Sequence, residues 1–157
     1  MMCDQYYEFE EPSIRTVEVE HDFVYKDLSC IITLSCFGWR SAYIVLPKGY
    51  KYFNRNSNTL SFIDCHGGIN YAQATHPCIY TGNDSWIIGW DYNHQGDAYD
   101  FEAVDRLFGE GTAASVKGSY YLSNANMLFH GSECRKYSVD DIALELKQVI
   151  DRYKLDE

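Results

Sequence analysis

Two alternating runs near the start of the chain constrain its fold more than any other feature. From Thr16 to Tyr25, apolar or aromatic residues alternate with acidic ones, and from Leu28 to Phe37 the alternation continues with small polar residues. A period of two places one kind of side chain on each face of a β-strand. The short Lys26-Asp27 joint between the two runs therefore predicts an antiparallel hairpin.

Later segments extend this hairpin into a mainly antiparallel sheet of about five strands. We expect a third strand at Arg40 to Leu46, a fourth at Leu60 to Cys65 and a fifth at Ser85 to Asp91. The fifth is apolar on both faces, which predicts an interior position in the sheet. The residues between the fourth and fifth strands, 70–84, are typical of a loop.

The second half of the chain predicts two helices. Apolar residues recur at helical spacing from Val139 to Tyr153, and Ser138 is a good N-cap for this stretch. A shorter helix is expected over 99–108, ended by Gly109, with a glycine-rich connection over 109–121. The predicted fold is a single α+β domain whose C-terminal amphipathic helix packs on one face of the sheet, with residues 1–13 as an acidic, loosely ordered extension.

Composition excludes several classes of protein. The 157 residues carry a net charge of −10, which argues against nucleic acid as a partner, and the apolar runs are too short to cross a membrane. The six cysteines include no CxxC pair, which favours reduced thiols over a zinc ribbon or a disulfide scaffold. The chain does not begin with a secretory signal pattern, so we expect a cytoplasmic protein, and a homo-oligomer is compatible with the sequence.

One acid-free segment could attract an anionic ligand. Leu28 to Ile63 contains no Asp or Glu, but it contains basic residues, among them Arg40 and Lys48, and interleaved aromatic residues such as Trp39. Aromatic faces stack on bases, and basic side chains meet phosphates. The segment therefore indicates a nucleotide-sized ligand.

Polar clusters follow the predicted fourth and fifth strands. If those strands were parallel neighbours, their ends would bring both clusters to one rim of the sheet. In the first cluster, Gly67 and Gly68 could bring backbone N–H groups close to a phosphate, or they could simply form a tight turn. The clusters contain Asp64, His66, Gly67 and Gly68 in the first and Asp91, His94 and Asp97 in the second.

The second cluster has the residue types of a metal site. Imidazole nitrogen and carboxylate oxygen both bind divalent metals, so Asp91, His94 and Asp97 could hold one ion, completed by Asp64 or His66. The same residues could instead perform acid–base chemistry or cap turns. We expect no cofactor, with one divalent metal as the alternative.

The order DCHGGINYA, then WIIGWDYNHQGD, then a closing amphipathic helix resembles a known group of proteins. These are small, uncharacterised proteins of tailed phages and prophages that carry HGG-[LI]-[TN]-[YF] and W-x-x-G-[FW]-D-x-x-H-x-G-D motifs. The resemblance implies a phage-encoded protein in the cytoplasm of an infected bacterium. By analogy, such a compact protein could counter bacterial immunity.

Three functions are consistent with these features, and the sequence leaves open whether the protein is an enzyme. The first is sequestration of a nucleotide-derived immune signal, the second is metal-dependent or acid–base hydrolysis of such a signal, and the third is inhibition of a host enzyme through protein–protein contact. The ligand-binding residues predicted for the first are Trp39, Arg40, Lys48, His66, Gly67, Gly68, Asn70, Tyr71, Trp90, Asp91, His94 and Asp97. The catalytic residues predicted for the second are Asp64, His66, Asp91, His94 and Asp97.

Overall fold

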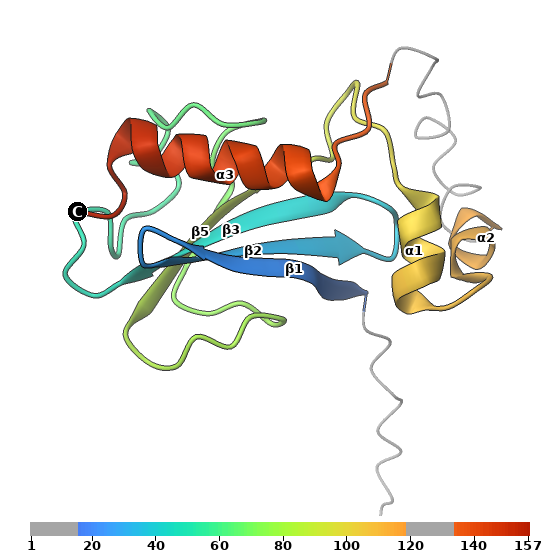
Figure 1. Ribbon diagram of the computed structural model, residues 1–157, viewed down its shortest axis with the longest axis horizontal. Coiled ribbons are helices and arrows are strands. Elements are labelled where there is room, and N and C mark those ends of the chain that lie inside the picture. Colours follow the sequence, from blue (N-terminus) through green and yellow to red (C-terminus); the bar gives the residue numbers. More distant parts are fainter. Residues whose placement is uncertain (1–15, 119–133) are drawn as a thin grey trace, which may run out of the picture.

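The computed structural model describes residues 16–118 and 134–157, which form one five-stranded antiparallel sheet with three helices (Figure 1). This confirms the predicted α+β fold. The predicted extension over 1–13 and residues 119–121 of the glycine-rich connection lie outside the described residues. The elements are β1 (Val17–Tyr25), β2 (Leu28–Ser35), β3 (Arg40–Pro47), β4 (Tyr71–Gln73), β5 (Ser85–Asp91), α1 (Phe101–Phe108), α2 (Thr112–Val116) and α3 (Val139–Tyr153).

The sheet has the strand order β1-β2-β3-β5-β4, and all neighbours are antiparallel. The predicted first hairpin is confirmed, because β1 and β2 pair from Tyr25 opposite Leu28 onward. Lys26 and Asp27 both have positive φ values, 48° and 63°. Two such residues in a row form the kind of tight turn that matches the twist of a hairpin. β5 lies between β3 and β4, so its predicted interior position is also confirmed.

The predicted fourth strand at Leu60 to Cys65 is wrong. Residues 57–62 form turns instead, in which the N–H of Ile63 donates to the carbonyl of Leu60 and the N–H of Thr59 donates to the side chain of Asn56. Asn side chains favour such local bonds over a strand ladder. Leu60 and Ile63 are still buried, because one turn directs both into the core.

The observed fourth strand, β4, lies in a segment whose sequence is typical of a loop. It has only three residues and pairs with β5, with Tyr71 opposite Gly89 and Gln73 opposite Ile87. Because β4 is antiparallel to β5, its first residue lies beside the last residues of β5. The turn that precedes β4 therefore meets the loop that follows β5.

α3 covers one face of the sheet, as Figure 1 shows. Its apolar residues, including Leu146 and Ile150, pack against those of β2, β3 and β5 in one buried cluster. Ser138 is the N-cap, as predicted: its Oγ accepts from the Asp141 N–H at 3.1 Å, and the Asp141 carboxylate accepts from the Ser138 N–H at 3.0 Å. This reciprocal pair fixes where the helix begins.

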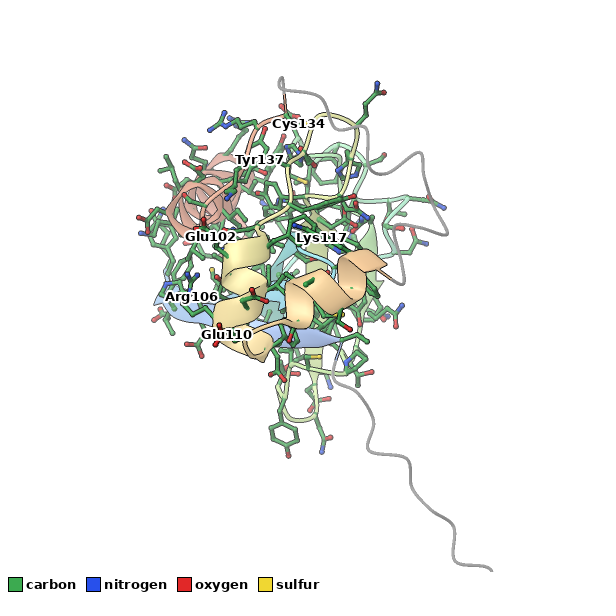
Figure 2. The ribbon with its side chains drawn as sticks, turned by 90° about the vertical axis from the view of Figure 1, so that its right-hand side faces the viewer. Glu102, Arg106, Glu110, Lys117, Cys134 and Tyr137 are labelled. Carbon is green, nitrogen blue, oxygen red and sulfur yellow. The ribbon has the colours of Figure 1, made fainter. Side chains whose placement is uncertain are left out.

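α1 and α2 lie beyond the ends of the strands, where Figure 2 shows them side by side. α1 begins at the N-cap Asp100, whose Oδ1 accepts from the Ala103 N–H at 3.1 Å, and Gly109 follows its last turn. This confirms a short helix ended by Gly109, beginning two residues later than predicted. α2 falls within the predicted glycine-rich connection.

The described cysteines all carry free thiols, which agrees with the prediction of reduced cysteines. They are Cys30, Cys36, Cys65, Cys78 and Cys134. Among the helices of residues 16–118 and 134–157, none is both long and apolar enough to cross a membrane.

Candidate functional site

The two predicted polar clusters do meet at one rim of the sheet, although the arrangement is antiparallel rather than parallel. The N–H of Asn70 donates to the carbonyl of Gly89 at 3.0 Å, and the Asn70 side chain donates to Asp91 Oδ2 at 2.7 Å. These bonds tie the turn before β4 to the end of β5. His66 is thereby brought against the loop that carries His94 and Asp97.

Asp97 lies at the centre of the site, with its carboxylate between two imidazoles. Its Oδ2 is 2.8 Å from His66 Nε2 and 3.4 Å from His94 Nδ1, and it accepts from the His94 N–H at 3.0 Å. Asp97 is only 3% exposed. Within residues 16–118 and 134–157, these two histidines are its ion-pair partners, and neither Lys nor Arg pairs with it. A buried carboxylate needs a positive or donating partner, so the two histidines and Asp97 form one interdependent unit.

The ring of His66 is fixed by aromatic packing from two directions. It stacks on Tyr92 at 4.5 Å between centroids with 14° between the planes, and Tyr137 lies at 4.6 Å. Tyr137 belongs to the segment that leads into α3, above α1 in Figure 2. The residues just before it are paired with the site loop, since Arg135 and Gly96 share a backbone hydrogen bond of 2.8 Å.

Glu145 of α3 contacts both His66 and Tyr92. Its Oε1 accepts from the His66 N–H at 2.8 Å and from the Tyr92 hydroxyl at 3.1 Å. Burial raises the pKa of Tyr92, so its hydroxyl keeps its proton and donates. Glu145 therefore fixes both the backbone of His66 and the ring on which His66 stacks.

His94 is held by carboxylates at both ring nitrogens. Nδ1 faces Asp97, while Nε2 lies 3.5 Å from Asp91 Oδ1. Asp91 is itself oriented by Asn70 and by the Asn93 N–H, which donates to its Oδ1 at 3.2 Å. Asp91 therefore contacts His94 from the side away from Asp97.

Gly67 and Gly68, predicted as a phosphate-binding pair, differ in their surroundings. Gly67 has φ +71° and packs directly under the His94 ring: a Cβ there would lie 2.2 Å from His94 Cε1. Gly68 has φ +80°, but a Cβ there would meet no atom within 4 Å. Glycine at 67 is thus required by the position of His94, and glycine at 68 by backbone conformation alone.

Substituting each glycine in turn separates these two requirements. We expect Gly68→Ala to cost about 1 kcal/mol for its positive φ, and Gly67→Ala to cost about 2–4 kcal/mol because the His94 ring must also move. Urea unfolding gives both values. The Cε1–H resonance of His94 should shift in Gly67→Ala and stay in place in Gly68→Ala. Equal costs for the two variants would contradict this account of Gly67.

Arg40, predicted to attract phosphate, is 5% exposed and joins three segments of the chain. It binds Glu20 in a bidentate pair at 2.7 and 2.9 Å, Asp100 at 2.9 Å and the Tyr137 carbonyl at 3.1 Å. Burial alone would raise the pKa of Asp100, but its bonds from the Ala103 N–H and Arg40 outweigh burial and hold that pKa below its ordinary value. The guanidinium charge is therefore already matched within the protein.

Lys48 and Tyr71, predicted ligand residues, lie away from the cluster. Lys48 follows β3 at the opposite end of the sheet, where its N–H donates to the Asp84 carbonyl. β5, which spans this distance with seven residues, is about 20 Å long. The Tyr71 ring packs on Tyr43 and His76.

The two tryptophans that were predicted to bind the ligand, Trp39 and Trp90, occupy different environments. Trp90 is 1% exposed within the core that α3 covers, and its Nε1 donates to the Tyr92 hydroxyl at 3.0 Å. Trp39 is partly exposed and stacks on Phe37 at 5.4 Å and 17°, with Tyr99 at 6.0 Å. Trp39 therefore has an accessible ring, whereas Trp90 is enclosed by protein.

Asp64, the remaining predicted residue, is not part of the cluster. Its side chain is 86% exposed and pairs with Arg152 of α3 at 3.6 Å. Asp64 lines a pocket of about 290 Å³ between the segment 64–66 and α3, and His66 lines the same pocket. Cys65 lies in the same pocket, where burial raises its pKa to about 12 and keeps the thiol protonated at neutral pH.

The sequence did not identify Glu145 or Tyr137 as parts of the site, and it placed Tyr92 near the second cluster without making it a ligand residue. Tyr92 stands inside the run that supplies Asp91 and His94, so its position was a usable signal. Glu145 and Tyr137 carry no local signal, because their contact with His66 depends on how α3 docks.

Comparisons with known proteins found no match: no family model, no curated protein and no solved structure matches this chain. The resemblance to phage proteins therefore stays a prediction.

Proposed function

We propose that the protein is a small hydrolase that cleaves a phosphoester bond in a nucleotide-type molecule, with His66, His94 and Asp97 as its reaction centre. The observation that carries this proposal is the buried Asp97 carboxylate, 2.8 Å from one imidazole and 3.4 Å from the other. An imidazole oriented by a carboxylate can remove a proton from water. The same three groups can alternatively hold a metal ion that activates water.

The reaction is the same in outline by either route. The activated water oxygen forms a bond to phosphorus as the bond from phosphorus to the leaving oxygen breaks. The proton lost by water is accepted at the centre or by solvent, and the leaving oxygen gains a proton. No oxidant, reductant or second substrate is needed.

The surroundings of the cluster favour hydrolysis over sequestration. A protein that only captures a nucleotide needs free cationic and aromatic groups, whereas Arg40 is paired with Glu20 and Asp100 and Trp90 is buried. Gly67 is explained by its contact with His94. What remains concentrated at this rim is a group of proton-transferring and metal-ligating side chains.

The nucleotide class rests on Trp39. Its partly exposed ring stacks on Phe37, and Tyr99 beside it donates from its hydroxyl to Asn93 Oδ1 at 2.9 Å, within the site loop. A base could stack on this aromatic group while its phosphate reaches the cluster. The same feature favours sequestration as the second candidate, in which the nucleotide is captured and retained without being altered.

A phage-encoded protein of either kind would act on a nucleotide immune signal in the cytoplasm of the infected cell. This biological setting rests on the resemblance of the HGG and WIIGWDYNHQGD motifs alone. The chemistry proposed for the cluster does not depend on it.

One experiment distinguishes the candidates. The purified protein is incubated with a panel of cyclic and linear nucleotides, the mixture is filtered, and the protein fraction is then heat-denatured and analysed. Hydrolysis predicts a converted nucleotide that accumulates over many turnovers, whereas sequestration predicts intact nucleotide released only from the denatured protein. Lys48→Ala changes a residue at the far end of the sheet and should behave as the wild type.

Intact nucleotide without product would overturn the hydrolase in favour of sequestration. Neither product nor retained nucleotide would overturn both and leave inhibition of a host protein as the remaining hypothesis.

A further inference from the structure

His66, His94 and Asp97 offer three metal-ligating atoms that lie within 4.8 Å of one another, the one such group found in the described residues. We propose that these three residues bind one divalent transition-metal ion. This inference rests on the proposed hydrolytic function and deepens it, because it names the means by which water is activated. Of the ligands that the sequence suggested, the proposed site keeps His94, Asp97 and His66 and leaves out Asp91 and Asp64.

The spacing of the three groups fits a metal shell after small movements. Ligand atoms at about 2.1 Å from a tetrahedral zinc ion are about 3.4 Å apart. The Asp97 oxygen is 3.4 Å from His94 Nδ1 and 2.8 Å from His66 Nε2. The His66–Asp97 pair would have to open by about 0.6 Å to reach this separation. All three ligand atoms already lie within 4.8 Å of one another.

The residues around the three ligands are arranged as a supporting layer. Metal-bound histidines commonly direct their second nitrogen to a carboxylate, which fixes the ring and its tautomer. Asp91 is placed for this role at 3.5 Å from His94 Nε2, and Asn70 and Asn93 hold Asp91 in place. Tyr92 and Tyr137 hold the plane of the His66 ring.

The charge of the site also favours a cation. Asp97 is 3% exposed, and neither Lys nor Arg of the described segments pairs with it. A divalent ion would compensate this buried carboxylate more fully than two imidazoles do. The net charge of the chain, −10, attracts cations to the protein as a whole.

The chemistry of the donors selects the class of ion. Two imidazole nitrogens and one carboxylate oxygen suit zinc, manganese or ferrous iron, whereas calcium and magnesium prefer oxygen ligands alone. Three protein ligands leave at least one position for water or substrate, which is the arrangement of catalytic rather than structural zinc sites. A water molecule at that position would supply the nucleophile of the proposed hydrolysis.

The test measures metal binding directly. Protein stripped with a chelator is dialysed against Zn²⁺ or Co²⁺, bound metal is counted by elemental analysis, and the visible spectrum of the Co²⁺ form reports coordination. We expect one ion per chain, and binding weakened at least about 100-fold in His94→Gln and about 10-fold in Asp91→Asn. His21→Gln, an exposed histidine on β1, is the matched control and should bind as the wild type does.

Far-UV circular dichroism checks that each variant is folded, and His94 is suited to the test because its side chain is 39% exposed. Binding that is absent from the wild type, or equal in wild type and His94→Gln, would overturn the metal site. Hydrolysis by the stripped protein in excess EDTA would overturn the role of the metal in activating water, while leaving the hydrolase with a metal-free centre. If metal binds at the three residues but no nucleotide is turned over, the proposed hydrolase function is wrong and the metal site is confirmed.

Discussion

Asp97→Asn should lower the rate of nucleotide hydrolysis about 10³- to 10⁴-fold while the protein stays folded. Asn has the size of Asp, so it fits the buried position, and its side-chain oxygen can still accept the His94 N–H that is 3.0 Å from the carboxylate in the wild type. The amide has no negative charge, so His66 and His94 would both lose the carboxylate that lies between their rings in the wild type. Initial rates at saturating nucleotide measure the effect.

Asp64→Asn is the matched control for this substitution. Asp64 precedes His66 by two residues, but its side chain is 86% exposed and lies outside the cluster. Its rate should stay within about two-fold of the wild type. A rate for Asp97→Asn above about one tenth of the wild-type rate would show that Asp97 is not part of the reaction centre.

Arg40→Met should lower the free energy of unfolding by about 3–5 kcal/mol. Methionine fills much of the space of the arginine stem but removes the buried partner of Glu20 and Asp100, which keep only the more exposed Arg106 at 3.7 Å and Lys136 at 3.6 Å. These carboxylates are only 11% and 16% exposed, so water cannot replace the lost guanidinium fully. Urea denaturation measures the loss.

Lys51→Met provides the comparison, because Lys51 pairs with Glu157 at 4.0 Å on an exposed surface. Its cost should be below about 0.5 kcal/mol. If Arg40→Met costs less than about 1 kcal/mol, the buried ion pairs do not hold the sheet, α1 and the Tyr137 segment together.

The sequence correctly predicted the strands and the helix whose apolar pattern is long enough to distinguish one type of secondary structure from another. β1, β2, β3 and β5 each have at least seven residues with a clear period or an apolar run, and α3 has fifteen. Leu60 to Cys65 has six residues, and its spacing fits a turn as well as a strand. β4 has only three residues, too few for a period to show, and its pairing with β5 defines it.

Site residues could be predicted from the sequence where polar side chains directly follow a strand. They could not be predicted where the contact comes from an element far away in the chain. His94 and Asp97 stand directly after β5, so their location at its end followed from the sequence. Nothing near Arg40 in the chain shows that Glu20 and Asp100 match its charge. The support that Glu145 gives to His66 likewise depends on the docking of α3.

The contacts of the site also determine when it can form during synthesis. His66 and Asp97 are 31 residues apart, His66 and Glu145 are 79 apart, and Arg40 and Tyr137 are 97 apart. Such long-range contacts form only after the intervening chain has been ordered. A nascent chain whose α3 is still inside the ribosome would therefore lack the contact between Glu145 and His66, and a fragment that ends before Tyr137 should not have the chemistry proposed for the site.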